Sequence, residues 1–302
     1  MLKQEKVFDV FDKLKAEIEK ASSGNFIQEQ RYLSLLRAAL SKNFEFNLFL
    51  WQSETKYSFF STATLRGILE DIITFSFLKS LSEDDKNIIS EKIILLKLLQ
   101  RCETQADFFD KKEPFQPVFK FKVQLEGNIK QNQSELKEGI KAIVKKYPQW
   151  QSKPSDSDGF PKIQNMAKEC GLEEIYKYLY VATSEWVHFN PHVLLRMGWG
   201  NDKDDNSNFM YNASTENFNI YYLDFTRFYG TYLFTIFCNL FKEDFLFSEQ
   251  FNKLVETLRI DIDETIRWPE IITFEEMNVK PPSAFMYALS HIVHSSKTKK
   301  AQ

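Results

Sequence analysis

The sequence predicts an all-α fold, a bundle of roughly eight to ten helices joined by long polar loops. Two observations lead to this prediction. The chain has 302 residues but only 9 glycines and 9 prolines, and so few turn-forming residues favour long helices over many short strands. Apolar residues also recur at helical spacing through most of the chain.

The first half of the chain is predicted to contain five helices, each ended by a break in the apolar periodicity. The sequence SSGN ends the first helix, and SEDD supplies an N-cap and first-turn acids for the fourth. The sequence KEPFQP separates the fourth from the fifth. The predicted ranges begin with a helix over Val7–Ile18 and continue with about 27–50, 57–81, 82–110 and 119–147.

The second half is predicted to alternate helices with two polar loops, at 147–162 and 198–214. The predicted helices cover 163–169, 173–187, about 215–241, 248–267 and near 283–294, with a short extended piece within 270–282. We interpret residues 1–302 as a single helical domain with its core at about 27–242, flanked by the N-terminal helix and a C-terminal helical extension. The stretch 148–162 is either a long surface loop or a domain boundary.

The composition excludes several classes of protein. A formal net charge of −3 gives no global basic field to attract nucleic acid, although a local basic groove is compatible with it. The three cysteines form no CxxC pair, which argues against a zinc ribbon and fits a reducing compartment. The charged N-terminus does not resemble a signal peptide, and the longest apolar run is too short to span a bilayer. We therefore expect a cytoplasmic protein without a membrane partner.

The helix predicted over 57–81 carries a charged pair on one face. Arg66 and Glu70 are four residues apart, while their neighbours are apolar around most of the helix. A charged pair on a helix buried on nearly all sides must be compensated within the fold. The pair is therefore either an ion pair that fixes the packing of the helix or the lining of a polar pocket.

Two of the four histidines, His188 and His192, flank Pro191. The proline disfavours helical geometry in the residue before it, so the helix is expected to end near 189 with His188 in its last turn. Ser184 lies four residues earlier, on the same face. An imidazole in this place is either a general acid or base tuned near neutral pH, or a C-capping side chain bonded to a carbonyl.

No metal or cofactor is expected. Glu185 and His188 have the spacing used in di-iron bundles, but the second motif that such a site needs is missing. The acidic loop beginning at Asp202 resembles a calcium loop, but Ser207 and Ala213 replace the glycine and the bidentate glutamate. Walker A, GxGxxG and GxSxG motifs are all missing from the sequence.

Two of these segments together resemble a bacterial helical family known as domain of unknown function 5677. The resemblance covers about residues 35–195 and rests on an R-x-x-x-E helix and on a later segment rich in spaced polar residues. The matching residues are Arg66, Glu70, Tyr176, Tyr180, Ser184, His188 and Pro191. The resemblance implies that Arg66, Glu70, Ser184 and His188 meet at one interior polar site, and we expect Tyr176, Tyr180, Pro191 and His192 to contribute binding contacts.

The chain has a looser similarity to helical ribonucleases of the HEPN type, which occur in toxin and antiphage systems. Their signature places an arginine shortly before a histidine on one helix. Thr183 stands five residues before His188, so that signature is missing here. A separated Arg66 and His188 could supply the same chemistry if they met, with the imidazole moving a proton and the guanidinium stabilising phosphate charge.

Two functions follow from these residues. The first is a sensor or partner-binding module in a bacterial stress or antiphage system. The alternative is a metal-independent ribonuclease or phosphodiester hydrolase that uses Arg66, Glu70, Ser184 and His188. The expected partner is RNA or a protein, and a homodimer is compatible with the long apolar helices.

Overall fold

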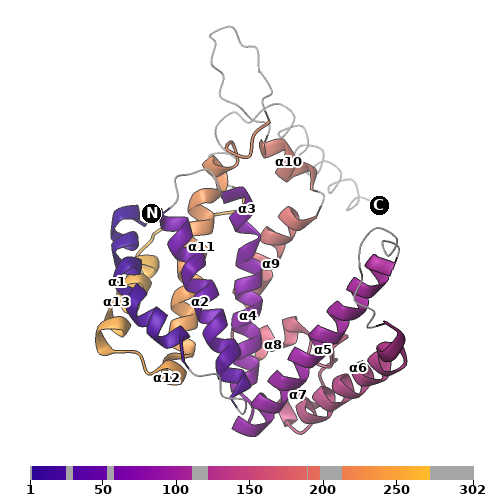
Figure 1. Ribbon diagram of the computed structural model, residues 1–302. Coiled ribbons are helices and arrows are strands. Elements are labelled where there is room, and N and C mark those ends of the chain that lie inside the picture. Colours follow the sequence, from indigo (N-terminus) through magenta and orange to yellow (C-terminus); the bar gives the residue numbers. More distant parts are fainter. Residues whose placement is uncertain are drawn as a thin grey trace, which may run out of the picture.

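The computed structural model describes residues 2–24, 30–52, 58–110, 122–188, 190–197 and 213–272. These residues form helices α1–α13 and no β-strand, apart from one isolated bridge between Ser155 and Pro161 (Figure 1). The predicted all-α fold is therefore confirmed.

The first six helices follow the predicted order, with one difference. They are α1 (Gln4–Ser22), α2 (Arg31–Gln52), α3 (Ser58–Thr62), α4 (Thr64–Lys79), α5 (Glu83–Asp110) and α6 (Lys122–Val144). The helix predicted over 57–81 is broken at Ala63 into α3 and α4. The predicted N-cap of α5 is confirmed, because Ser82 Oγ accepts a 3.3 Å hydrogen bond from the backbone N–H of Asp85.

The remaining helices are α7 (Pro148–Gln151), α8 (Ile163–Glu169), α9 (Glu173–Val187), α10 (Pro191–Met197), α11 (Asn219–Leu240), α12 (Lys242–Phe245) and α13 (Glu249–Asp263). Helices α8 and α9 have their predicted bounds. Helix α10 was not predicted: Pro191 ends the preceding helix but also begins a new one, since its fixed φ suits a first helical position. The helix predicted at 283–294 and most of the stretches 198–214 and 270–282 lie outside the described residues.

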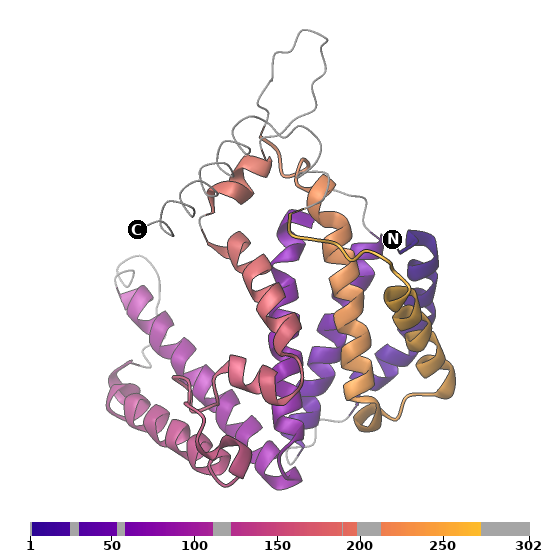
Figure 2. The same ribbon diagram turned by 180° about the vertical axis from the view of Figure 1, so that it is seen from behind.

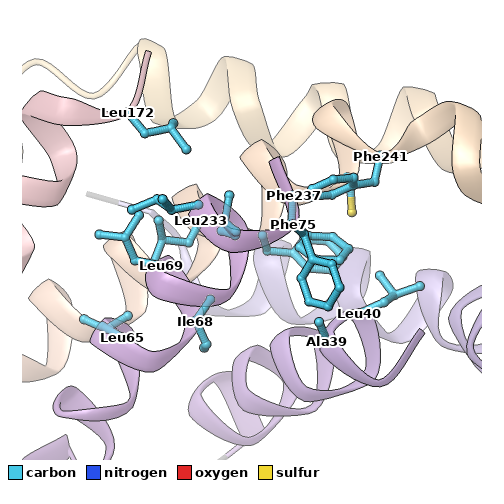
Figure 3. Close-up of a cluster of buried hydrophobic side chains, with 14 of the residues drawn as sticks. Ala39, Leu40, Leu65, Ile68, Leu69, Phe75, Leu172, Leu233, Phe237 and Phe241 are labelled. Atoms are coloured by element: carbon cyan, nitrogen blue, oxygen red, sulfur yellow. The ribbon is translucent and has the colours of Figure 1, made fainter. Parts of the chain in front are cut away.

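Helix α4 lies at the centre of the bundle. It contacts α2, α3, α8, α9 and α11, and every one of its residues is at least partly buried. Figure 3 shows Leu65, Ile68 and Leu69 of α4 in the same apolar cluster as Leu40 of α2 and Leu233 of α11. A helix that is apolar around its circumference is stable only when other elements surround it. The prediction of a helix buried on nearly all sides is therefore confirmed.

The α5–α6 hairpin extends from this centre (Figure 1). Helix α5 packs on α2, and the segment that follows α6 packs on α4. The rings of Trp150 and Phe160 are buried, and their centroids lie 5.0 and 5.8 Å from that of Phe77 on α4. The stretch 148–162 thus packs on the central helix through two aromatic side chains. Its role as a domain boundary stays a prediction.

We expect Phe77→Ala to lower the free energy of unfolding by about 3–5 kcal/mol, because it leaves a cavity between α4, Trp150 and Phe160. Phe60→Ala is the matched control, since Phe60 is exposed, and it should cost no more than about 0.5 kcal/mol. Urea unfolding of the three proteins measures both values. Equal losses in the two variants would contradict the packing described for Phe77.

We expect Leu246→Gly to stabilise the protein. Leu246 ends α12 in the left-handed region, with φ 52° and ψ 47°, and its side chain is exposed. A side chain in this conformation costs roughly 1–2 kcal/mol, which glycine avoids, while little packing is lost. Part of this gain is offset by the greater freedom of glycine in the unfolded chain, so the net increase should be about 0.5–1 kcal/mol.

Leu246→Ala is the control for this substitution, because alanine removes the exposed side chain but keeps the strained backbone. It should leave the midpoint of urea unfolding unchanged. An equal gain from glycine and alanine would show that the side chain, and not the backbone conformation, is unfavourable at this position.

Candidate functional site

Helices α4 and α9 run side by side through much of the bundle (Figure 2). Arg66 and Glu70 on α4 are one turn apart, as are Tyr180 and Ser184 on α9. Because residues at this spacing share a helix face, the contact between the two helices brings the two sets together. We call the five residues Arg66, Glu70, Tyr176, Tyr180 and Ser184 the α4–α9 cluster.

The guanidinium of Arg66 is held by three neighbours. Its Nε donates a 2.8 Å hydrogen bond to Glu70 Oε1, and its Nη1 donates a longer one of 3.4 Å to Ser184 Oγ. Its Cζ lies 4.4 Å from the centre of the Tyr180 ring. The hydrogen bond with Glu70 raises the pKa of Arg66 above its ordinary value, so the group stays charged.

Tyr176 lies beneath Tyr180 in the cluster. The two ring centroids are 5.4 Å apart. Burial of Tyr176 raises the pKa of its hydroxyl, and the nearby carboxylate of Glu70 adds to this effect. A neutral phenol therefore supports the ring on which Arg66 is stacked.

Aromatic contacts fix α9 from its other side. The Trp186 ring packs against Phe218 and Tyr222 on the α11 side, with centroids 5.4 and 4.7 Å away. Tyr178 contacts Tyr229 of α11 at 5.6 Å. Pairs of aromatic rings in such tilted or edge-on arrangements add stability beyond their buried area. The face of α9 that meets α4 is therefore fixed by packing on the opposite face.

The α4–α9 cluster opens to the surface. The side chains of Arg66 and Glu70 are 29% and 36% exposed, and Tyr180 is 38% exposed. We expected these side chains to lie in the interior of the protein. That expectation is wrong, because the cluster lies at the surface, where the two helices meet the solvent. A ligand could reach it without a rearrangement of the fold.

The structure does not bring His188 into the cluster, so the expectation that it meets Arg66 is wrong. Helix α9 ends at Val187, and His188 has extended backbone, with φ −112° and ψ 162°. Its backbone N–H donates to the carbonyl of Ser184 at 3.2 Å. Its exposed imidazole makes no hydrogen bond, ion pair or ring contact with any described residue. The extended conformation takes His188 out of the helical register that would place it beside Ser184.

The other predicted binding residues lie at different places. Tyr176 and Tyr180 are in the cluster, whereas Pro191 begins α10 and is exposed. His192 follows it on α10, and its side chain lies outside the described part of the structure. The amide oxygen of Asn190 accepts a 3.4 Å hydrogen bond from the backbone N–H of Val193, which gives α10 an N-cap.

Sequence reasoning missed Val181, which is 55% exposed immediately after Tyr180. A valine in an apolar helix resembles a core residue, so its type alone does not indicate that this position faces outward. The pattern of charged residues at Glu174 and Lys177 indicates the exposed side of α9 and could have located it.

The described residues provide neither a metal site nor a membrane span. No group of three or more His, Cys, Asp or Glu side chains in that part of the chain could hold a metal ion. The calcium-like loop beginning at Asp202 lies outside it. None of the described helices combines the length and apolar character needed to cross a membrane.

Comparison with known proteins gives one match. Residues 51–207, just over half of the chain, match a family of unknown function, DUF5677. The chain belongs to this family. The matched region contains both α4 and α9, and it confirms the resemblance drawn from their residues. No curated protein and no solved structure matches the chain. The looser similarity to HEPN-type ribonucleases stays a hypothesis.

We expect a double-mutant cycle on Arg66→Ala and Tyr180→Ala to give a coupling energy of about 0.5–1 kcal/mol, because the two side chains are stacked. The control cycle pairs Arg66→Ala with Val181→Ala, which lies next to Tyr180 but should couple by no more than about 0.3 kcal/mol. Urea unfolding of the single and double variants supplies the values. Equal coupling in both cycles would contradict the stacked geometry.

Proposed function

We propose that this DUF5677 chain is a partner-binding module and that the α4–α9 cluster, with the exposed side of α9, is the surface that binds a protein. The proposal rests on Arg66, whose side chain is both held in place by its neighbours and partly exposed. Its guanidinium is held by Glu70, Tyr180 and Ser184, and yet the side chain is 29% exposed. A side chain fixed before binding loses less conformational entropy when the partner arrives.

Arg66 keeps hydrogen-bonding capacity for a partner. Its Nε and Nη1 donate to Glu70 and Ser184, whereas its Nη2 makes no hydrogen bond with a described residue. A partner carboxylate could accept from the free donors of the guanidinium, and such charge-assisted bonds are stronger than neutral ones. This capacity supports an Asp or Glu side chain as one contact of the partner.

Apolar groups border the charged one. The Tyr180 ring packs against Arg66 and is still 38% exposed, and the next residue of α9, Val181, is 55% exposed. Arginine and tyrosine are the residue types most often found at the energetic centre of protein interfaces. We therefore propose a partner segment that places an acidic side chain next to an apolar one, and a sensor role in a bacterial stress or antiphage system as its cellular setting.

The contacts support binding more than catalysis. The charge of Arg66 is paired with Glu70, and the exposed imidazole of His188 makes no hydrogen bond, ion pair or ring contact with the α4–α9 cluster. A general acid or base must come within hydrogen-bond reach of the same substrate that the arginine holds. A ribonuclease would need His188 and Arg66 to approach each other. RNA cleavage is therefore the alternative result of the experiment described next.

The test uses a photo-crosslinking amino acid at residue 181 in a bacterial host, with the same amino acid at the exposed position 266 as a control. We expect a discrete adduct from position 181 only, which disappears in an Arg66→Gln background. The adduct identifies the partner, whose affinity is then measured with purified proteins. Arg66→Gln should weaken it by at least about tenfold, as for an interface hot spot, because a charge-assisted contact is lost.

Arg259→Gln is the matched control for the affinity measurement, since Arg259 is half-exposed on α13, where its Nε lies 3.7 Å from Asp263. It should leave the affinity unchanged. Unchanged binding in both Arg66→Gln and Tyr180→Ala would contradict the proposed surface. RNA degradation by the wild type that is lost in a stably folded His188→Ala variant would replace the binding function with the nuclease.

A further inference from the structure

A second candidate site lies away from the α4–α9 cluster. A pocket of about 550 Å³ opens beside Ser22 and Gly24 at the end of α1 and is floored by α2. Ser34, Arg37 and Ser41 on α2 are three and four residues apart, so they share the face that lines the pocket. The volume falls within the range of roughly 300–1,000 Å³ typical of small-molecule sites. The pocket residues precede the 51–207 family match.

Arg37 is the unusual residue of this pocket. Its Nε is buried and has no hydrogen-bond partner. Its guanidinium lies against Gly24, where an added Cβ would come within 2.7 Å of Nη1, and the φ of +150° at this position also favours glycine. Arg37 lines the pocket, and its guanidinium donates no hydrogen bond to a described residue. Because donors in folded proteins are nearly always paired, the guanidinium keeps donors available for an acceptor in the pocket.

The hydroxyl groups of the pocket provide acceptors. Ser22 donates to the carbonyl of Ile18 at 2.7 Å, and Ser34 donates to the carbonyl of residue 30 at 3.3 Å. Ser41 donates to Glu45 Oε1 at 2.8 Å. A hydroxyl has a single hydrogen, so each of these oxygens can only accept further hydrogen bonds while it makes the bond described.

The charges in the pocket favour an anion at one end. Lys42 contributes its positive charge beside Arg37, although its Nζ is also 2.7 Å from Asp71 Oδ2. Among the described residues, Glu45 is the one acidic side chain that lines the pocket, and it accepts the hydrogen bond from Ser41. The pocket thus has donors and positive charge around Arg37 and acceptor oxygens around the serines. The described residues that line it include no aromatic side chain on which a nucleobase could stack.

We propose that this pocket binds a small hydroxyl-rich oxyanion, such as a sugar phosphate or a sugar acid. The phosphate or carboxylate accepts hydrogen bonds from Arg37, and the ligand's hydroxyl groups donate to the serine oxygens and to Glu45. Arginine matches the geometry of either oxyanion, so phosphate and carboxylate share this part of the recognition. The proposal is independent of the partner-binding function at the α4–α9 cluster.

The test is isothermal titration calorimetry of the full chain with glucose 6-phosphate, gluconate, inorganic phosphate and glucose. We expect at least one of the two sugar oxyanions to bind more tightly than inorganic phosphate, and glucose not to bind at the same millimolar concentration. Comparing glucose 6-phosphate with gluconate distinguishes a phosphate ligand from a carboxylate ligand.

Three variants locate the binding. Arg37→Gln should weaken it by at least about tenfold, because a charge-assisted contact is lost. Gly24→Ala should also weaken it, since the new Cβ displaces the guanidinium while the arginine remains. Arg259→Gln removes an arginine outside the pocket and should change nothing. Thermal melts of each variant establish that it is folded.

Three results would overturn the proposal. The first is a wild-type protein that binds neither sugar oxyanion at millimolar concentration. The second is a folded Arg37→Gln variant that binds as tightly as the wild type. The third is inorganic phosphate binding as tightly as both sugar oxyanions, which would contradict the role of the serine oxygens.

Discussion

The burial of α4 on nearly all sides is the constraint on which the described bundle depends. Because other helices surround it, its polar side chains must lie where two helices meet and must find partners there. On one side Arg66 and Glu70 pair with each other and with α9. On another side Asp71 pairs with Lys42 of α2 at 2.7 Å. Burial raises the pKa of Asp71, and Lys42 acts in the opposite direction.

This arrangement lets α9 pack into the bundle through one face and contribute to the proposed binding surface through another. Helix α9 is fixed on one face by Trp186 and Tyr178 against aromatic rings, and its other face meets Arg66 through Tyr180 and Ser184. The resulting surface is ordered before any partner binds. An ordered arginine stacked on tyrosine suits the proposed recognition of an acidic and apolar protein segment. The cluster and the α1–α2 pocket are built from different residues and could act separately.

Much of the fold could be predicted from local signals. The glycine at 171 and the proline at 191 border α9, and the four-residue spacing placed Arg66 with Glu70. Features that depend on tertiary structure could not be predicted. The break at Ala63, the exposure of the cluster and the orphaned Nε of Arg37 all follow from how helices pack. Helix α9 ends at Val187, so His188 has extended backbone and lies outside the last turn in which the position of Pro191 had placed it.

The most direct test of the account is NMR of the arginine side chains, since the central claim is that Arg66 is held in place before a partner binds. The account predicts that the Nε–H signal of Arg66 exchanges slowly with water, that its Nη signals are resolved by restricted rotation, and that both features are lost in Glu70→Gln. An Nε–H signal that behaves like that of the half-exposed Arg259, and that does not respond to Glu70→Gln, would contradict it.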